Sequence, residues 1–387
     1  MIVKWIGVIV AVAMIVIIFI DAFESVVLPR RIKHNYRLAR LFYRPTWRLW
    51  RAASRLLPAG KWRYGFLSGF GPLSLVGLLG LWASVLIFAF ALLHWSAQTA
   101  LSLPGEGDDR FDIYLYFSGT TFFTLGYGDA VPTGFWGRAL SVAQAGMGFG
   151  FLATIISYLP VLYQTFSRRE TAISLLDARA GSPPTAGELV RRMVESKGLA
   201  SVGPLFVDWE RWSAELLESQ LSFPVVSYYR SQHDNQSWVG ALTTMLDTSA
   251  LWIAASDESV DYQARLTFAA ARHAAVDLGL VFDASPNPTV ADRLSSTQLA
   301  ALYETLRVGG LTNRHAADVE ARLTRLRRLY EPFVDALAEY FELELPPFVP
   351  EKLPVDNWQT SPVLSRAPGL CGLGTDHEPL RANEDIH

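Results

Sequence analysis

Three long apolar stretches divide the chain and predict three membrane-spanning helices. They cover about Trp5–Leu28, Pro72–Trp95 and Gly137–Phe166. A helix needs roughly 20 mostly apolar residues to cross the ~30 Å hydrocarbon core of a bilayer, and each stretch is long enough. A secretory signal peptide is the alternative for the first stretch. The long apolar core, the Asp21 and Glu24 that follow it, and the lack of a small-residue cleavage site favour an uncleaved helix.

The loops between these stretches differ sharply in charge, which predicts their orientation. Residues 30–63 carry eleven Lys or Arg and no acid, whereas residues 96–136 carry Arg110 against five acidic residues. Basic residues close to helix ends stay on the cytoplasmic side. We therefore expect a multi-pass protein of the cell membrane, with the N-terminus outside and the large C-terminal region in the cytoplasm.

Arginines in the basic loop recur every three or four residues and define one face of a helix. They are Arg37, Arg40, Arg44, Arg48, Arg51 and Arg55. The opposite face is apolar. Such a helix is expected to lie in the membrane interface with its arginines against anionic lipid headgroups, and Pro45 is expected to break or offset it. A voltage sensor is the alternative, but the segment is too polar to span and lacks companion sensor helices.

A short apolar segment and a glycine-rich turn lie between the second and third stretches. Tyr114–Phe123 is too short to span a membrane, and the turn that follows it reads Thr124, Leu125, Gly126, Tyr127, Gly128, Asp129. Irregular backbone at membrane depth is tolerated only where it lines a cavity or is buried in protein. A strand whose successive carbonyls all point to one axis requires positive φ at some residues, and glycine adopts positive φ without steric cost. A glycine-rich turn without this role is the alternative.

This segment resembles the pore loop of potassium channels, whose filter usually reads Thr-Val-Gly-Tyr-Gly-Asp. Five of the six positions match, and the resemblance covers about residues 71–165. It implies that the carbonyls of Thr124, Leu125, Gly126 and Tyr127, with the Thr124 hydroxyl, bind dehydrated K⁺. Leu125 and Tyr127 are expected to brace the strand from behind, beside the packing partners Tyr116 and Phe117, and Asp129 is expected at the outer mouth. Leu125 replaces the usual β-branched residue, which leaves the strictness of K⁺ over Na⁺ selectivity open.

The resemblance also bears on assembly and gating. One chain supplies one filter strand and four close the ring, so a homotetramer is favoured over pairing with other subunits. Gly148 and Pro160 are candidate gating hinges in the third span; close helix packing is the equally weighted alternative for the glycine. Asp21 and Glu24 have either a sensing role or ordinary pairing with Arg30 and Arg31.

The C-terminal region predicts a cytoplasmic α-helical domain followed by a disordered tail. From residue 168 onward the chain carries 20 basic and 30 acidic residues. Helices are expected at 204–220, 237–255, 259–278, 295–308 and 315–343, with a capping box from Thr185 to Glu188. His233 with Asp234 and His273 with Asp277 are more typical of hydrogen-bonding groups than of metal ligands. The expected domains are 1–28, 29–70, 71–167, 168–345 and the Pro-rich tail 346–387.

Composition and motifs narrow the function. The chain is 50% hydrophobic and 18% charged, below the ~25% charge of soluble proteins. Its single cysteine, Cys371, excludes a disulfide framework. The sequence predicts an all-α membrane protein that acts as a passive potassium channel, with K⁺ in the filter, no organic cofactor, no other metal, no enzymatic activity and no nucleic-acid partner. A receptor or adaptor with a vestigial pore and a less selective cation channel are the alternatives; the gating stimulus and any soluble partner are not legible.

Overall fold

The computed structural model describes residues 2–26, 38–102, 110–196, 198–231, 235–256, 261–286 and 292–350. Over these residues the protein is almost entirely helical, and the one strand pair, β1 (Leu101–Ser102) with β2 (Val131–Pro132), is antiparallel. The helices are α1 (Ile2–Val26), α2 (Leu38–Ser54), α3 (Lys61–Ser68), α4 (Phe70–Ser96), α5 (Phe111–Phe122), α6 (Phe135–Ala180), α7 (Ala186–Glu195), α8 (Val202–Ser222), α9 (Trp238–Ala255), α10 (Asp261–Phe282), α11 (Ser296–Val308), α12 (Ala316–Arg327) and α13 (Glu331–Phe341), with the short 3₁₀ helices η1 (Gly198–Ser201) and η2 (Pro224–Tyr228).

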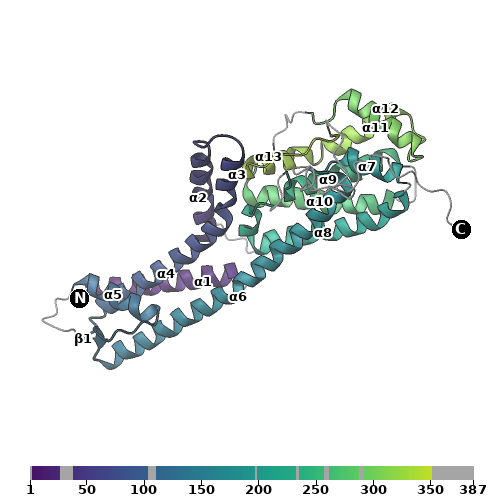
Figure 1. Cartoon of the computed structure of the whole chain (residues 1–387). Helices are drawn as coiled ribbons and strands as arrows, with labels where there is room; N and C mark the ends of the chain where they lie inside the picture. The colour runs from purple at the N-terminus through teal and green to yellow at the C-terminus, as the bar shows by residue number, and fades with distance from the viewer. Residues whose placement is uncertain are drawn as a thin grey trace, which may run out of the picture.

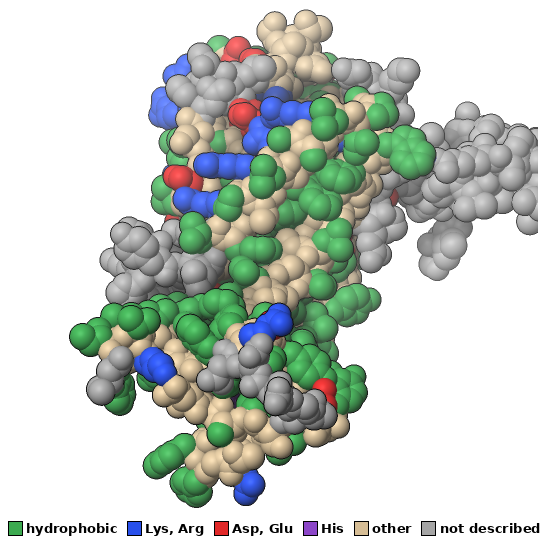
Figure 2. All heavy atoms as spheres, turned by 90° about the vertical axis from the view of Figure 1, so that its left-hand side faces the viewer, with side chains coloured by type: hydrophobic (Ala, Val, Ile, Leu, Met, Phe, Trp, Pro, Cys, Tyr) green, Lys and Arg blue, Asp and Glu red, His purple; other side chains and the backbone are tan. Residues whose placement is uncertain are grey.

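The predicted all-α membrane fold is confirmed. Three helical segments are long and apolar enough to cross a membrane: α1, α3 with α4, and α6. Figure 1 shows α1, α4 and α6 side by side, with α5 and β1 at one end and α7–α13 at the other. Hydrophobic side chains cover much of the surface at the α5 end, in the lower part of Figure 2. Helix α1 packs along α4, where Ile18 lies in a cluster with Leu78, Trp82 and Leu86.

The carboxylate of Asp21, on α1, forms a contact with α4. Its side chain is buried, and the indole Nε1 of Trp82 on α4 donates a hydrogen bond of 2.9 Å to its Oδ2. The pairing expected with Arg30 and Arg31 lies outside the described residues. Asp21 therefore holds α1 to α4.

Helix α6 extends well beyond the membrane. Its 46 residues correspond to about 69 Å at 1.5 Å per residue, twice the ~30 Å hydrocarbon core. The helix continues past the domain boundary expected at residue 167 and ends at Gly181, which has a φ of 80°. Ile173 and Leu176 are fully buried in the core of the helical domain. The pore region and the helical domain therefore share one helix.

The helical domain is built around α9, all of whose residues are buried. The side chain of Thr185 accepts a hydrogen bond from the backbone N–H of Glu188, as expected for the first half of the capping box. The second half does not form, because the Thr185 N–H donates to the Ala180 carbonyl and the Glu188 carboxylate binds Arg191 and Arg192. The single helix expected at 315–343 is instead two helices, α12 and α13. Pro332 near the start of α13 has no N–H to bond backward, so a new helix begins there.

The beginning of the predicted tail is part of this domain. Phe348 is fully buried, and its carbonyl accepts a hydrogen bond of 2.9 Å from the backbone N–H of Gly187. Ordered packing therefore reaches past residue 346, where disorder was expected to begin. The rest of the tail, 351–387, lies outside the described residues.

Helices α2 and α3 form a hairpin, hereafter the α2–α3 hairpin, that packs on the helical domain. Pro45 lies inside α2 and does not break it; the Thr46 hydroxyl donates to the Phe42 carbonyl in the same turn. Trp47 is buried and donates through Nε1 to the carbonyl of Tyr340, at 2.9 Å. This side of α2 therefore contacts protein, where lipid was expected.

Several of the arginines predicted to face lipid headgroups bind carboxylates of the helical domain. Arg51 and Arg55 contact Glu342, at 2.5 and 3.4 Å, and Arg44 lies 3.5 Å from Asp283. The regular spacing of the arginines could not reveal these partners, because the carboxylates lie more than 200 residues further along the chain. Arg48 is exposed, whereas Arg37 and the side chain of Arg40 lie outside the described residues.

Candidate functional site

Helix α5 is the short re-entrant helix that the sequence predicted. Asp112 lies in its first turn, where a negative charge stabilises a helix N-terminus. Tyr114, Phe117 and Phe122 are buried, and the Tyr114 hydroxyl donates to the carbonyl of Thr99, at 3.0 Å. These contacts fix the helix beside α4 and direct its C-terminal end into the segment 123–129.

A buried polar chain joins α5 to both neighbouring helices. Gln144 on α6 donates through Nε2 to the carbonyl and hydroxyl oxygens of Ser118, at 2.9 and 2.6 Å. The Ser118 hydroxyl donates in turn to the carbonyl of Ile87 on α4, at 2.7 Å. Sequence reasoning missed Gln144. The available signal was an amide inside an apolar span, because a polar group buried in a membrane is costly unless it is paired.

The backbone of residues 123–129 alternates in an unusual way. Thr124, Gly126 and Gly128 have positive φ values of 55°, 58° and 81°. Glycine adopts this region without penalty, whereas a residue with a Cβ is strained there by roughly 1–2 kcal/mol. The turn is held to α5 by hydrogen bonds from the N–H of Thr124 to the Thr121 carbonyl and from the N–H of Leu125 to the Thr120 carbonyl. Positive φ at Thr124 was not predicted.

The side chains of this segment are open in the single chain. Leu125 and Tyr127 are 54% and 69% exposed, so a single chain leaves more than half of each side chain uncovered. The Thr124 hydroxyl donates to the carbonyl of Phe123, at 2.7 Å, which leaves its oxygen able to accept. Tyr116 donates to Oδ2 of Asp129, also at 2.7 Å, and so ties the end of the segment to α5.

Gly148 is where α6 meets the end of the short helix. A Cβ at this position would lie 1.9 Å from the carbonyl oxygen of Phe122, whereas Cβ atoms at Gly146 and Gly150 would meet nothing within 4 Å. Close packing is therefore one role of Gly148 in this structure. Pro160 is exposed and lies within the continuous α6. Their roles as hinges stay predictions.

Comparison with known proteins places this region. Residues 80–164, which contain most of α4, all of α5, the segment 123–129 and much of α6, match a protein-family model described as ion channel. This part of the chain, hereafter the channel domain, is similar to ion channels. The chain is also similar to YdjJ of Bacillus subtilis (strain 168), described as an uncharacterized membrane protein. The two are 27% identical over 185 residues, 46% of this chain, and the match spans about half, 52%, of the relative. No solved structure matches.

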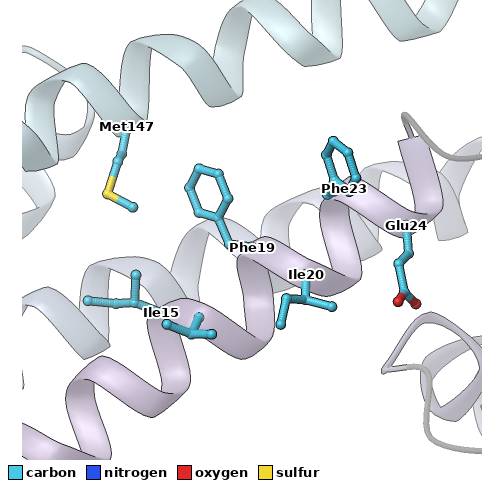
Figure 3. Close-up of a pocket in the computed structure, with 7 residues that line it drawn as sticks. Ile15, Phe19, Ile20, Phe23, Glu24 and Met147 are labelled. Carbon is cyan, nitrogen blue, oxygen red and sulfur yellow. The ribbon is translucent and has the colours of Figure 1, made fainter.

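An apolar groove separates α1 from α6. It has a volume of about 470 Å³ and is lined by residues of α1 and by Met147 of α6. Figure 3 shows Met147 and Phe19 pointing toward each other from the two helices, and Glu24 lies at the far end of the lining from Ile15. Helix α1 therefore adds to the channel domain on its α4 side and leaves this face of α6 uncovered within one chain.

One of the two candidate metal pairs is described by the structure. His273 Nε2 lies 3.5 Å from Asp277 Oδ2, with the histidine exposed and the aspartate largely buried, and His233 and Asp234 lie outside the described residues. Within the described part of the chain, no three His, Cys, Asp or Glu side chains are grouped to hold a metal ion. The aromatic residues Trp209 and Trp212 pack against each other at 4.6 Å between ring centroids, in the core of the helical domain.

Proposed function

We propose that the channel domain is potassium-selective and that four copies of the chain form the pore. The observation that carries the proposal is the segment 124–129, in which positive φ recurs at alternate residues between a short buried helix and a spanning helix. Backbone of this kind directs carbonyl oxygens rather than side chains at a ligand. Rings of backbone carbonyls replace the hydration shell of K⁺ in potassium-channel filters.

In this proposal K⁺ is the transported ion and passes without chemical change. Carbonyl oxygens of Thr124, Leu125, Gly126 and Tyr127 take the place of water, and ions move by displacing one another between adjacent sites. Asp129, held by Tyr116, and the acidic outer loop raise the local concentration of cations at the mouth. The Thr124 hydroxyl oxygen provides a further acceptor at the inner end.

The fourfold assembly is supported by what a single chain leaves uncovered. The segment 124–129 is exposed along its length, and Phe149, Leu152 and Ile156 of α6 are large apolar side chains that are also exposed. Some of these side chains can face lipid, but an open filter strand cannot, because its carbonyls need a partner in an apolar medium. A closed ring of identical chains covers the apolar side chains of α6 and places the carbonyls around a shared axis, where an ion can bind them.

The helical domain is proposed to lie in the cytoplasm, with the N-terminus outside, and to regulate the pore. Its core includes the last turns of α6, so a change in its packing acts directly on the helix that lines the inner pore. Gly148 and Pro160 are the proposed bending points. A ligand that binds one packing state better than the other shifts the population of open pores.

Potassium flux into proteoliposomes tests this function. We expect flux with the wild-type protein and its loss in Gly126→Ala, because alanine is strained at a φ of 58° in each of four strands. Gly134→Ala is the matched control, since Gly134 has a φ of −87° and open space around it. Unchanged flux in Gly126→Ala, or no flux in the wild type, contradicts the proposal; the second result favours a receptor or adaptor with a vestigial pore.

A less selective cation channel is the second candidate, and Leu125 is the observation that favours it. Leucine lacks a second branch at Cβ, so the side chain constrains the backbone less than valine or isoleucine does. We expect Leu125→Val to raise the K⁺/Na⁺ permeability ratio if the wild-type filter is loose, and to leave it unchanged if the filter is already strict. Reversal potentials in mixed K⁺ and Na⁺ solutions distinguish the two functions.

A further inference from the structure

The α2–α3 hairpin has two faces with different surroundings. One face is covered by the helical domain through Trp47 and Arg51. The other face is open, and its large apolar side chains are unusually exposed. These are Leu41 and Leu49 of α2, Leu56 in the turn that follows α2, and Trp62 of α3, with exposed fractions of 70%, 71%, 88% and 80%. They form what we call the outer stripe.

Leu41 and Leu49 are eight residues apart on α2, a little more than two turns of 3.6 residues, so they lie on roughly the same side of the helix. Leu56 is exposed in the turn that follows the end of α2 at Ser54. Scattered apolar residues on a surface are ordinary, but a group of this size indicates a surface that is covered in use. Exposed basic residues, Arg48 and Lys61, accompany the group.

The positive charge of the hairpin indicates which kind of surface can cover the outer stripe. Residues 30–63 contain no acidic residue, and three arginines of the hairpin, Arg51, Arg55 and Arg63, already contact Glu342. Arg48 and Lys61 are exposed, as are the leucines and Trp62. Leucine and tryptophan between basic residues suit a bilayer surface with anionic headgroups, where the apolar side chains enter the acyl boundary and the cations meet phosphates.

The position of the hairpin agrees with this partner. Helix α3 leads directly into the spanning helix α4 through Gly69, so the hairpin stands at the end of a membrane span. Figure 2 looks at the molecule from the end at which α5 lies, with the helical domain behind. Lys and Arg side chains lie among hydrophobic ones over its upper part, where α2 and α3 stand in Figure 1.

We propose that the outer stripe of the α2–α3 hairpin binds anionic lipids of the adjacent membrane leaflet. The hairpin is thereby held between the bilayer on one side and the helical domain on the other. In this proposal Arg48 and Lys61 bind lipid headgroups, whereas Arg51, Arg55 and Arg63 bind Glu342. This proposal needs only that the chain is embedded in a membrane and is independent of the ion that the pore selects.

Lipid contact at position 49 tests the proposal in the full-length protein. Cys371 is replaced by serine, and an environment-sensitive fluorophore is attached through Leu49→Cys or, as the control, through Val308→Cys. Val308 lies on α11 of the helical domain and is 70% exposed, which matches Leu49. The proteins are reconstituted in phosphatidylcholine vesicles with and without phosphatidylglycerol, and quenching by brominated forms of each lipid is measured.

We expect the label at position 49 to be quenched, more strongly by brominated phosphatidylglycerol than by brominated phosphatidylcholine, and the label at position 308 to be unaffected. A basic residue near a charged bilayer contributes about a fivefold preference. Arg48→Gln should therefore reduce the preference for phosphatidylglycerol about fivefold, whereas Arg211→Gln, an exposed arginine on α8, should not change it.

Three results overturn the proposal. A label at position 49 that is as solvated as the label at position 308 shows that no membrane covers the stripe. A label that is shielded from water but quenched by neither lipid shows that protein covers it. Equal quenching by both lipids shows membrane contact without anionic recognition. Because no reading depends on ion flux, failure here is distinct from failure of the potassium-channel function.

Discussion

Two glycines of the channel domain are required for different physical reasons. Gly126 has a φ of 58° and open space around it, so its backbone conformation alone demands glycine. Gly148 has ordinary helical geometry, but a Cβ there would lie 1.9 Å from the Phe122 carbonyl oxygen. The contact joins α6 to the residue just before the filter segment. A change at Gly148 should therefore reach the filter through packing.

Gly148→Ala should disturb the filter, whereas Gly150→Ala should not. Backbone atoms of Phe122 cannot rotate away as a side chain could, and overpacking of this kind costs about 1–3 kcal/mol. We expect a reduced K⁺/Na⁺ permeability ratio or reduced flux for Gly148→Ala. Gly150 meets nothing within 4 Å and provides the matched control in the same helix. Wild-type selectivity and flux in Gly148→Ala would show that the contact is dispensable.

At the scale of elements, the carboxylate of Glu342 contacts three arginines of the α2–α3 hairpin. Glu342 accepts hydrogen bonds from Arg51 and Arg63, at 2.5 and 2.6 Å, with Arg55 at 3.4 Å. Burial alone raises the pKa of Glu342, but the hydrogen bonds and charges of the arginines outweigh it and hold the pKa below its ordinary value of 4.5. The carboxylate therefore stays charged in the folded protein.

This lowered pKa predicts an acid-sensitive attachment of the hairpin. Stabilisation by Glu342 is fully present above the unfolded pKa of about 4.5 and is lost as the pH falls through the lower folded pKa. We expect Glu342→Gln to cost about 1–2 kcal/mol at neutral pH and the difference from wild type to shrink below pH 4.5. Thermal unfolding of the purified protein across pH measures this.

Glu344→Gln is the control for this prediction, because Glu344 is exposed and two residues away. It should leave stability unchanged at neutral pH. A gap between wild type and Glu342→Gln that stays constant as the solution is acidified would mean that the carboxylate charge does not hold the hairpin.

At the scale of the whole molecule, η2 connects the helical domain to both spanning helices of the channel domain. Val225 and Val226 pack with Leu75 of α4 and with Leu162 and Phe166 of α6. The buried Arg169 of α6 donates to the carbonyls of Val226 and Tyr229, at 2.9 and 2.7 Å. The helical domain therefore contacts α4 and α6 directly through η2.

Arg169→Leu should loosen this connection while sparing the filter. Two carbonyls lose their donor, at about 1–3 kcal/mol for each buried group left unsatisfied, so the thermal unfolding midpoint should fall. We expect the K⁺/Na⁺ permeability ratio of the remaining folded channel to be unchanged. Arg168→Leu is the control, since the neighbouring arginine is exposed. Equal unfolding midpoints for the two variants would argue against a structural role of Arg169.

Much of the fold was predictable because it depends on local pattern. The three spans, α5 and most helices of the domain follow from apolar runs and helical periodicity, and Gly126 and Gly128 follow from the need for positive φ. The predictions were wrong where contacts with residues distant in the sequence determine how far an element extends. The chain past 346 packs because Phe348 finds a buried site, and α6 continues past Arg168 because Ile173 and Leu176 enter a core.

By itself the sequence determined that this is a helical membrane protein with a short helix and a glycine-bearing segment between two spans, because burial of apolar side chains in lipid and the steric limits on φ act within a few residues. Only the tertiary structure decided which arginines of the basic loop face protein, that Gly148 packs against the carbonyl of Phe122, and that η2 lies between α4 and α6. Those contacts join residues far apart in the chain, and their partners are chosen by shape and charge that no local pattern contains.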